Sequence, residues 1–154
     1  MTGAAVIAAL YCVLTMLLQA ISFGVVQLRV AEAMTLLPVV WPEAIPGLFI
    51  GCMLSNVLGG YGLPDVVFGS LATLVAAYCT RWLRKTPMLA ALPPVLLNAV
   101  VVGLLLHVYA DAPLTLTMLY VGLGQAAACY GLGLPLLYAL RRTPLGKRGN
   151  ADKG

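Results

Sequence analysis

Three hydrogen-bonding side chains lie close together in an otherwise apolar stretch of the chain. Gln27, Arg29 and Glu32 provide an amide, a guanidinium and a carboxylate. A carboxylate has two acceptor oxygens and can take two parallel N–H donors, and an amide can both donate and accept. Such groups are costly in apolar surroundings unless they face protein, water or a ligand. We therefore predict a ligand site here, although Arg29 and Glu32 can instead form a salt bridge with each other.

Other polar side chains are candidates for the same site. Asn56 and Asn98 can contact a ligand or tie helices together, and the tyrosines can stack on a planar ligand or lie at a membrane interface. The single histidine, His107, is expected to be solvated rather than functional. The predicted binding residues are Gln27, Arg29, Glu32, Asn56, Tyr61, Asp65, Asn98, Tyr120 and Gln125.

The composition determines the class of protein in which these residues lie. Hydrophobic residues make up 62% of the 154 residues and charged residues only 9%, whereas soluble domains are about a quarter charged. Too little polar surface remains to cover a soluble globule. Apolar runs without alternation argue against a β-barrel, and a helical span needs roughly 20 residues. We predict an all-α integral membrane protein, a bundle of six transmembrane helices.

Turn signals divide the chain into elements. Proline after Trp41 ends one helix, and the glycines from Gly59 to Gly62 form a turn before Asp65, which we expect to cap the next helix. Residues 1–142 are predicted to form one transmembrane domain without a cleavable signal peptide, and residues 143–154 a basic, disordered tail. The expected spans are 3–20, 29–40, 43–58, 65–83, 88–109 and 114–140, with a loop or re-entrant piece at 21–28.

Basic residues predict the orientation, because Lys and Arg accumulate in cytoplasmic loops. With six spans, one side collects every Lys and Arg except Arg29. Both termini are therefore predicted to be cytoplasmic, and Arg29 and Glu32 to lie toward the outer face. Asn98 and Gln125 then fall near the middle of the membrane. This distribution favours a pocket that opens to the outside.

The first helix carries pairs of small residues four apart. Such pairs let another helix approach closely, since association in lipid depends on van der Waals contact. These pairs can serve internal packing within the chain, or they can form a docking face for another protein. The two ladders are Ala4 with Ala8 and Ala5 with Ala9.

No enzyme is indicated by the motifs. The sequence has no HExxH, GxSxG or Walker motif, so any ATP hydrolysis would reside in a partner. The four cysteines, Cys12, Cys52, Cys79 and Cys129, are far apart and are read as small buried side chains rather than metal ligands. We predict no metal, no cofactor and no nucleic-acid partner.

Several stretches together make the chain resemble the QueT family of substrate-binding S components of energy-coupling factor (ECF) transporters. The resemblance covers almost the whole chain except the tail. The matching stretches are Gln27 to Pro38, Pro42 to Leu48, Asn56 with Gly59 to Gly62 and Asp65, Phe68 to Thr73, Pro93-Pro94 with Asn98-Ala99, and Tyr120 to Gln125.

The resemblance implies a six-helix S component in the bacterial cell membrane that imports a queuosine precursor, a 7-deazaguanine base. It also implies a transmembrane coupling protein and two cytoplasmic ATPases as partners, with Ala4, Ala5, Ala8 and Ala9 as the docking residues. A guanine-like edge suits Glu32, with Gln27, Asn98 or Gln125 for its carbonyl. Alternatives are an S component for another vitamin or nucleobase, a self-standing facilitator, and a purely structural membrane subunit.

Overall fold

The computed structural model describes residues 2–18, 29–60 and 62–144. Every regular element within these ranges is helical, so the all-helical prediction is confirmed there. Two helices, Pro87–Ala110 and Leu114–Arg142, are long and apolar enough to cross a membrane by length and composition. Gln27, Tyr61 and the part of the predicted tail beyond residue 144 lie outside the described residues.

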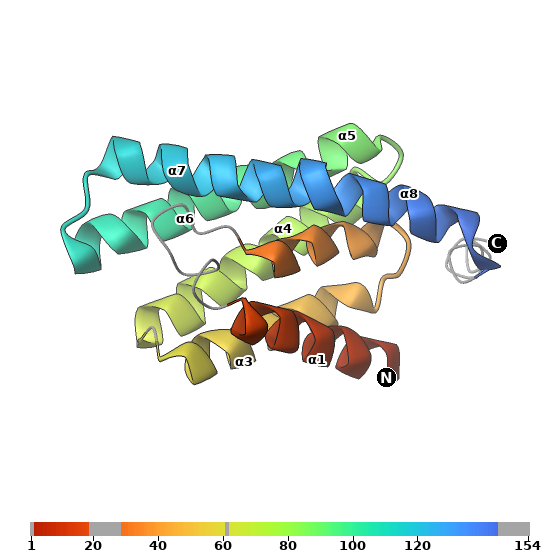
Figure 1. Cartoon of the computed structure of the whole chain (residues 1–154), viewed down its shortest axis with the longest axis horizontal. Helices are drawn as coiled ribbons and strands as arrows, with labels where there is room; N and C mark the ends of the chain where they lie inside the picture. Colours follow the sequence, from red (N-terminus) through yellow and green to blue (C-terminus); the bar gives the residue numbers. More distant parts are fainter. Residues whose placement is uncertain (1, 19–28, 61, 145–154) are drawn as a thin grey trace.

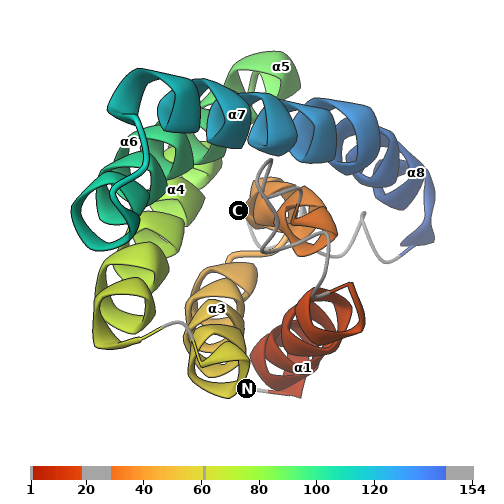
Figure 2. The ribbon, with the colours of Figure 1, turned by 60° about the vertical axis from the view of Figure 1, so that its left-hand side comes forward.

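A buried helix lies at the centre of the bundle. This is η1 (Val30–Val39), which is wound as a 3-10 helix, and residues 31–40 are all buried. The other elements lie around it, as Figure 2 shows, where η1 is the orange helix in the middle. In chain order they are α1 (Thr2–Leu17), α3 (Ala44–Gly59), η2 (Asp65–Gly69), α4 (Ser70–Trp82), α5 (Pro87–Ala90), α6 (Leu92–Ala110), α7 (Leu114–Ala126), η3 (Ala127–Gly133) and α8 (Leu134–Arg142).

The 3-10 winding of η1 was not predicted, although its bounds agree with the expected helix at 29–40. Runs of 3-10 helix longer than three or four residues are uncommon. Pro38 within it has no N–H to donate, and its ring would crowd an α-helical carbonyl four residues earlier. Thr35 donates its hydroxyl to the carbonyl oxygen of Glu32 at 2.6 Å, which stabilises the same turn.

Helices α1 and α3 pack side by side through small residues (Figure 1). A Cβ atom added at Gly47 would lie 2.7 Å from the carbonyl oxygen of Ala4, and one added at Gly51 would lie 2.8 Å from that of Ala8. Only glycine allows the backbones to come so close. One of the two predicted alanine ladders is therefore used inside the chain, against α3.

The turn between α3 and α4 uses glycines in the left-handed region. Gly60 has φ 71° and Gly62 has φ 91°, values that favour glycine, so the predicted turn is confirmed. The expected capping role of Asp65 is wrong. The chain is already helical from Leu63, and Asp65 lies inside the first turn, where the π-helical segment η2 begins.

The second half of the chain forms two long helices. The first runs from α5 into α6, and the second runs continuously from α7 through the π-helical segment η3 into α8 (Figure 1). Their outer bounds lie within two residues of the predicted spans 88–109 and 114–140. A Cβ added at Gly133 would lie 3.0 Å from the carbonyl oxygen of Ala33, so the second helix approaches η1 closely.

Basic side chains gather at one end of the bundle. The start of α1 and the end of α8 lie at the same end in Figure 1. There, Arg141 donates to the carbonyl oxygen of Arg84 at 3.3 Å, and Arg81 donates to the carbonyl oxygen of Pro38 at 3.0 Å. The start of η1, beside Arg29 and Glu32, points toward the opposite end (Figure 1).

Candidate ligand-binding site

Glu32 is the buried carboxylate at the centre of the candidate site. It is 1% exposed, and its Oε1 accepts a hydrogen bond of 2.5 Å from the hydroxyl of Tyr11 on α1. The other oxygen, Oε2, makes no hydrogen bond within the described part of the chain. A buried charged oxygen without a donor is costly. This atom is therefore available to an N–H donor of a ligand.

Arg29 lies beside Glu32 and is also buried, at 4% exposed. It precedes the first residue of η1, and the backbone N–H of Glu32 donates to its carbonyl oxygen at 2.9 Å. Its guanidinium is close enough to Glu32 and Asp65 for their charges to attract. Arg29 thus offsets the negative charge of two carboxylates that come from different elements. A buried charge requires such a partner of opposite charge.

Asn56 connects α3 to the start of η2. Its Nδ2 donates to the carbonyl oxygen of Asp65 at 2.9 Å. Asn56 therefore ties two helices together, which was one of its two alternative roles. Its Oδ1 is buried and has no hydrogen-bond partner among residues 2–18, 29–60 and 62–144, and the same holds for Oγ of Ser70. Asn56 therefore fastens two elements and still presents a vacant acceptor.

Asn98 and Gln125 place buried amides on two further helices. They are 3% and 2% exposed, and Asn98 lies near enough to the Glu32 carboxylate to stabilise its charge. Gln125 lies four residues before Cys129 on the same continuous helix, and Sγ of Cys129 is 3.7 Å from the carbonyl oxygen of Glu32. Neither Nδ2 of Asn98 nor Oε1 of Gln125 has a partner of normal hydrogen-bond geometry in the described ranges.

Tyr11, which was not among the predicted binding residues, is fully buried and donates a hydrogen bond to Glu32. Its position did carry a signal. Ala4, Ala8, Tyr11 and Thr15 are spaced four, three and four residues apart, so they form one stripe of a helix. That stripe is the face that α1 turns toward α3 and η1.

Two buried thiols were assigned only a packing role and lie close to these polar groups. Sγ of Cys52 is 3.4 Å from the hydroxyl of Thr73, which donates to it. Sγ of Cys129 is 3.7 Å from the hydroxyl of Thr35. Both are free cysteines, and within the described ranges no group of three His, Cys, Asp or Glu side chains is arranged to hold a metal ion.

Some predicted residues are not brought to this cluster. Tyr120 is 41% exposed on α7. Of the alanines on α1, Ala8 is buried and Ala4 partly buried against α3, whereas Ala5 and Ala9 are exposed. The structure thus separates the four alanines into an internal pair and an outward-facing pair.

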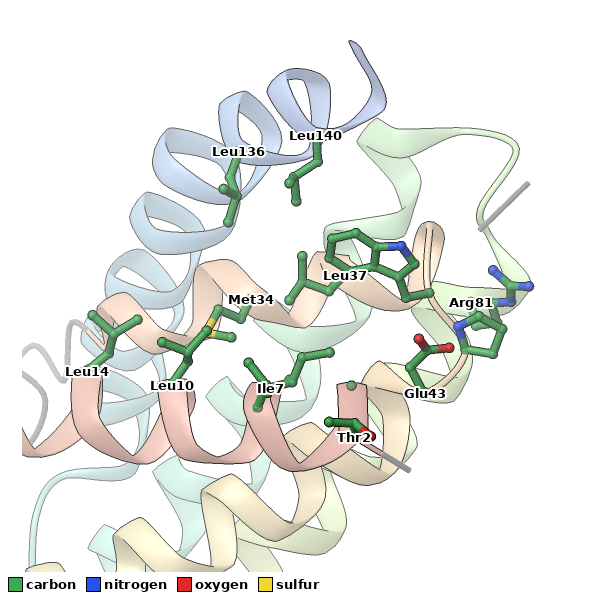
Figure 3. Close-up of a pocket in the computed structure, with 14 residues that line it drawn as sticks. Thr2, Ile7, Leu10, Leu14, Met34, Leu37, Glu43, Arg81, Leu136 and Leu140 are labelled. Carbon is green, nitrogen blue, oxygen red and sulfur yellow. The ribbon is translucent and has the colours of Figure 1, made fainter. Parts of the chain in front are cut away.

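A second feature, an apolar groove of about 880 Å³, lies away from the polar cluster. Figure 3 shows that side chains of α1, η1 and α8 point into it, with Glu43 and Arg81 at one end. Most of the side chains that line the groove are hydrocarbon, and such side chains cannot orient a polar ligand. The polar cluster is therefore the candidate site for a polar ligand. The apolar lining of the groove includes Leu10, Met34, Leu37, Leu136 and Leu140.

The polar cluster has a definite chemical character. Oε2 of Glu32, Oδ1 of Asn56 and Oε1 of Gln125 are acceptors, Nδ2 of Asn98 is a donor, and the hydroxyl of Ser70 can be either. Buried polar groups are normally hydrogen bonded. Their convergence around η1 suits a small ligand that has several N–H donors and a carbonyl.

Comparison with known proteins gives two matches and one negative result. The family model described as QueT transporter matches residues 1–142. A curated relative, the queuosine precursor transporter QueT of Lactococcus lactis subsp. cremoris (strain MG1363), is 44% identical over 73 residues, which are 46% of this chain and 43% of that protein. The match thus spans less than half of the relative's length. No solved structure matches the chain.

Proposed function

Since this chain belongs to the QueT transporter family, we propose that it is the substrate-binding S component of an ECF-type importer for a queuosine precursor. The observation that carries the proposal is the set of buried polar atoms without partners around Glu32, within the described part of the chain. Polar residues within a membrane bundle commonly mark a substrate site. The relative whose name specifies a queuosine precursor shares 44% identity over the matched segment.

A 7-deazaguanine base fits the chemistry of the cluster. Its guanine-like edge has adjacent N–H donors, one of which would bind Oε2 of Glu32. An amide can rotate to present its oxygen or its nitrogen, so Asn98 or Gln125 would donate to the carbonyl of the base. Gln27, outside the described residues, is the further amide candidate. A ligand of this type would satisfy groups that are otherwise costly to bury.

The proposed topology has six spans with both termini in the cytoplasm of a bacterial cell. The end with Arg81, Arg84 and Arg141 would face the cytoplasm, because basic residues are retained there. Arg81 contacts Pro38 near one end of η1, and Arg29 begins the other. A 3-10 helix of 10 residues is about 20 Å long at a rise of about 2.0 Å per residue. The polar cluster would therefore lie toward the outer face.

We further propose that a transmembrane coupling protein and two cytoplasmic ATPases supply the energy. The docking surface on this chain is the exposed face of α1, which carries Ala5 and Ala9. Val6 and Leu10 beside them are each 51% exposed, and the apolar groove adjoins this face. Small and apolar side chains suit close helix packing in lipid.

Ligand identity is the direct test of this function. The protein would be purified in detergent and its small-molecule content identified by mass spectrometry, followed by titration with 7-deazaguanine. We expect a deazapurine to co-purify and the titration to saturate. A different vitamin or nucleobase would contradict the substrate assignment. Uptake of 7-deazaguanine by vesicles containing this chain alone would favour a self-standing facilitator.

A further inference from the structure

The hydrogen bond between Tyr11 and Glu32 gives the two oxygens of one carboxylate different surroundings. Oε1 accepts from the Tyr11 hydroxyl at 2.5 Å, whereas Oε2 has no partner in the described ranges. We propose that Tyr11 is a positioning residue for ligand binding, which holds Oε1 so that Oε2 is presented to the ligand. This inference rests on the proposed function of the Glu32 site.

A positioning group is needed because the terminal torsion of a glutamate is soft. Rotation about its last bond is broad and roughly two-fold, so an unrestrained carboxylate would not keep one oxygen directed into the site. A hydrogen bond to a charged acceptor is stronger than one between neutral groups. The Tyr11 hydroxyl therefore fixes both the plane of the carboxylate and the choice of oxygen.

Tyr11 is itself held rigidly enough for this task. It is 0% exposed and packs in the same core cluster as Leu48 and Cys52. Its Cβ would lie 2.9 Å from a Cβ added at Gly51, so the backbone of α3 approaches it directly. A side chain packed in this way has little rotamer freedom, and its hydroxyl can serve as a fixed donor.

Tyr11 also restricts which ligands Glu32 can bind. A phenolic hydroxyl that donates to Oε1 stabilises the carboxylate as an acceptor. A ligand with an N–H donor at Oε2 then binds more tightly, whereas a ligand with a carbonyl at that position binds more weakly. Tyr11 thus contributes to specificity without being placed in contact with the ligand.

A double-mutant cycle tests whether Tyr11 acts through Glu32. The four proteins would be native, Tyr11→Phe, Glu32→Met and the double variant, since Met has a similar length but no acceptor. Affinity for 7-deazaguanine is measured by titration calorimetry, and folding is checked by thermal melting. Thr15→Val is the matched control, because Thr15 is equally buried on α1 but its hydroxyl donates to the carbonyl oxygen of Tyr11, at 2.8 Å.

We expect Tyr11→Phe to weaken binding by about 3- to 10-fold, as for the loss of one hydrogen bond. Thr15→Val should change affinity by less than about twofold, and Tyr11→Phe should have no further effect on Glu32→Met. Equal losses in both backgrounds, or native affinity in Tyr11→Phe, would overturn the proposal. If Tyr11→Phe does not fold, Glu32→Met and the double variant are compared, where equal affinity supports it and a loss overturns it. Absence of binding by the native protein would overturn the proposed function as well.

Discussion

Glu32 combines a structural contact with a proposed recognition role in one side chain. Its Oε1 is joined to α1 through Tyr11, and Arg29 lies near enough to offset its charge. Its Oε2 is buried without a partner in the described part of the chain. Burying a carboxylate in this way destabilises the protein unless a ligand completes the set. The cost of burying this carboxylate therefore supports its proposed role as a binding group.

Replacement of the Glu32 charge should weaken ligand binding. Glu32→Gln removes a charge-assisted hydrogen bond, which contributes about 1.5–3 kcal/mol, so affinity for 7-deazaguanine should fall roughly tenfold or more. Titration calorimetry would measure the change. Glu43→Gln is the matched control, since Glu43 lies at the end of the apolar groove and its loss should leave affinity unchanged. Native affinity in Glu32→Gln would remove Glu32 from the site.

The two buried asparagines should respond differently to the same substitution. Asn56→Leu breaks the hydrogen bond to the carbonyl oxygen of Asp65 and should destabilise the ligand-free protein by about 1–3 kcal/mol. Asn98→Leu removes an amide whose Nδ2 has no partner of normal geometry in the described part of the chain and which only assists the nearby Glu32 charge, so ligand-free stability should fall less than in Asn56→Leu. Thermal melting with and without ligand would measure both. A marked fall in the melting temperature of ligand-free Asn98→Leu would show that Asn98 mainly ties helices together.

At the scale of elements, the sequence predicted where most helices lie but not how they are wound. Proline at position 42 and the glycines at 60 and 62 marked turns by local chemistry alone. The 3-10 form of η1 and the π-helical segments η2 and η3 depend on contacts with other helices, such as Gly133 against Ala33. A span of about 12 residues is apolar in either winding, so periodicity could not distinguish them.

The same distinction applies to the candidate site. Glu32, Asn98 and Gln125 could be found from sequence because a polar residue in an apolar segment is conspicuous. Tyr11 lies in the middle of α1 and could not be found in this way, since a tyrosine has a large apolar ring that fits an apolar segment. Its role depends on the register of α1 against η1. That register is set by glycine contacts between α1 and α3, which one sequence does not reveal.

The packing of α1 on α3 should tolerate no added methyl group. Gly51→Ala would place a Cβ 2.8 Å from the carbonyl oxygen of Ala8, and backbone cannot yield without shifting the helix. We expect a loss of about 1–3 kcal/mol in stability, seen as a lower melting temperature. Gly131→Ala is the control, because nothing lies within 4 Å of a Cβ there and alanine favours a helix. Equal melting temperatures for the two variants would contradict this account of the contact.

At the scale of the whole molecule, the polar cluster and the proposed docking surface are separate. The polar side chains converge on the buried start of η1, whereas Ala5 and Ala9 face outward from α1. The apolar groove adjoins the docking surface, since Val6 and Leu10 line it, and it extends toward the basic end. Binding and assembly can therefore be disrupted independently.

Substitutions in the two alanine ladders should have different consequences. Ala9→Leu adds bulk on the exposed face of α1, so it should prevent capture of the coupling protein in a pull-down while leaving affinity for 7-deazaguanine unchanged. Ala8→Leu adds bulk to the buried seam with α3 and should lower the melting temperature even without the partner. Normal capture by Ala9→Leu would count against this docking face.

The charge distribution makes the topology testable. A reporter enzyme that is active only after export would be fused after the basic end of α8, which carries Arg141 and Arg142. We expect it to be inactive, and a reporter that works only in the cytoplasm to be active. The opposite pattern would reverse the orientation and place the polar cluster on the inner side.

Helix α1 presents Tyr11 to Glu32 on one side and its exposed alanines on the other. If the proposed partner docks on these alanines and displaces α1, the Tyr11 hydroxyl would move relative to the carboxylate, and ligand binding would restrain the helix in return. Such coupling is reciprocal, so the factor by which the ligand changes affinity for the partner equals the factor by which the partner changes affinity for the ligand. The single hydrogen bond between Tyr11 of α1 and Glu32 of η1 would then let the assembled complex lower the affinity for the ligand and release it.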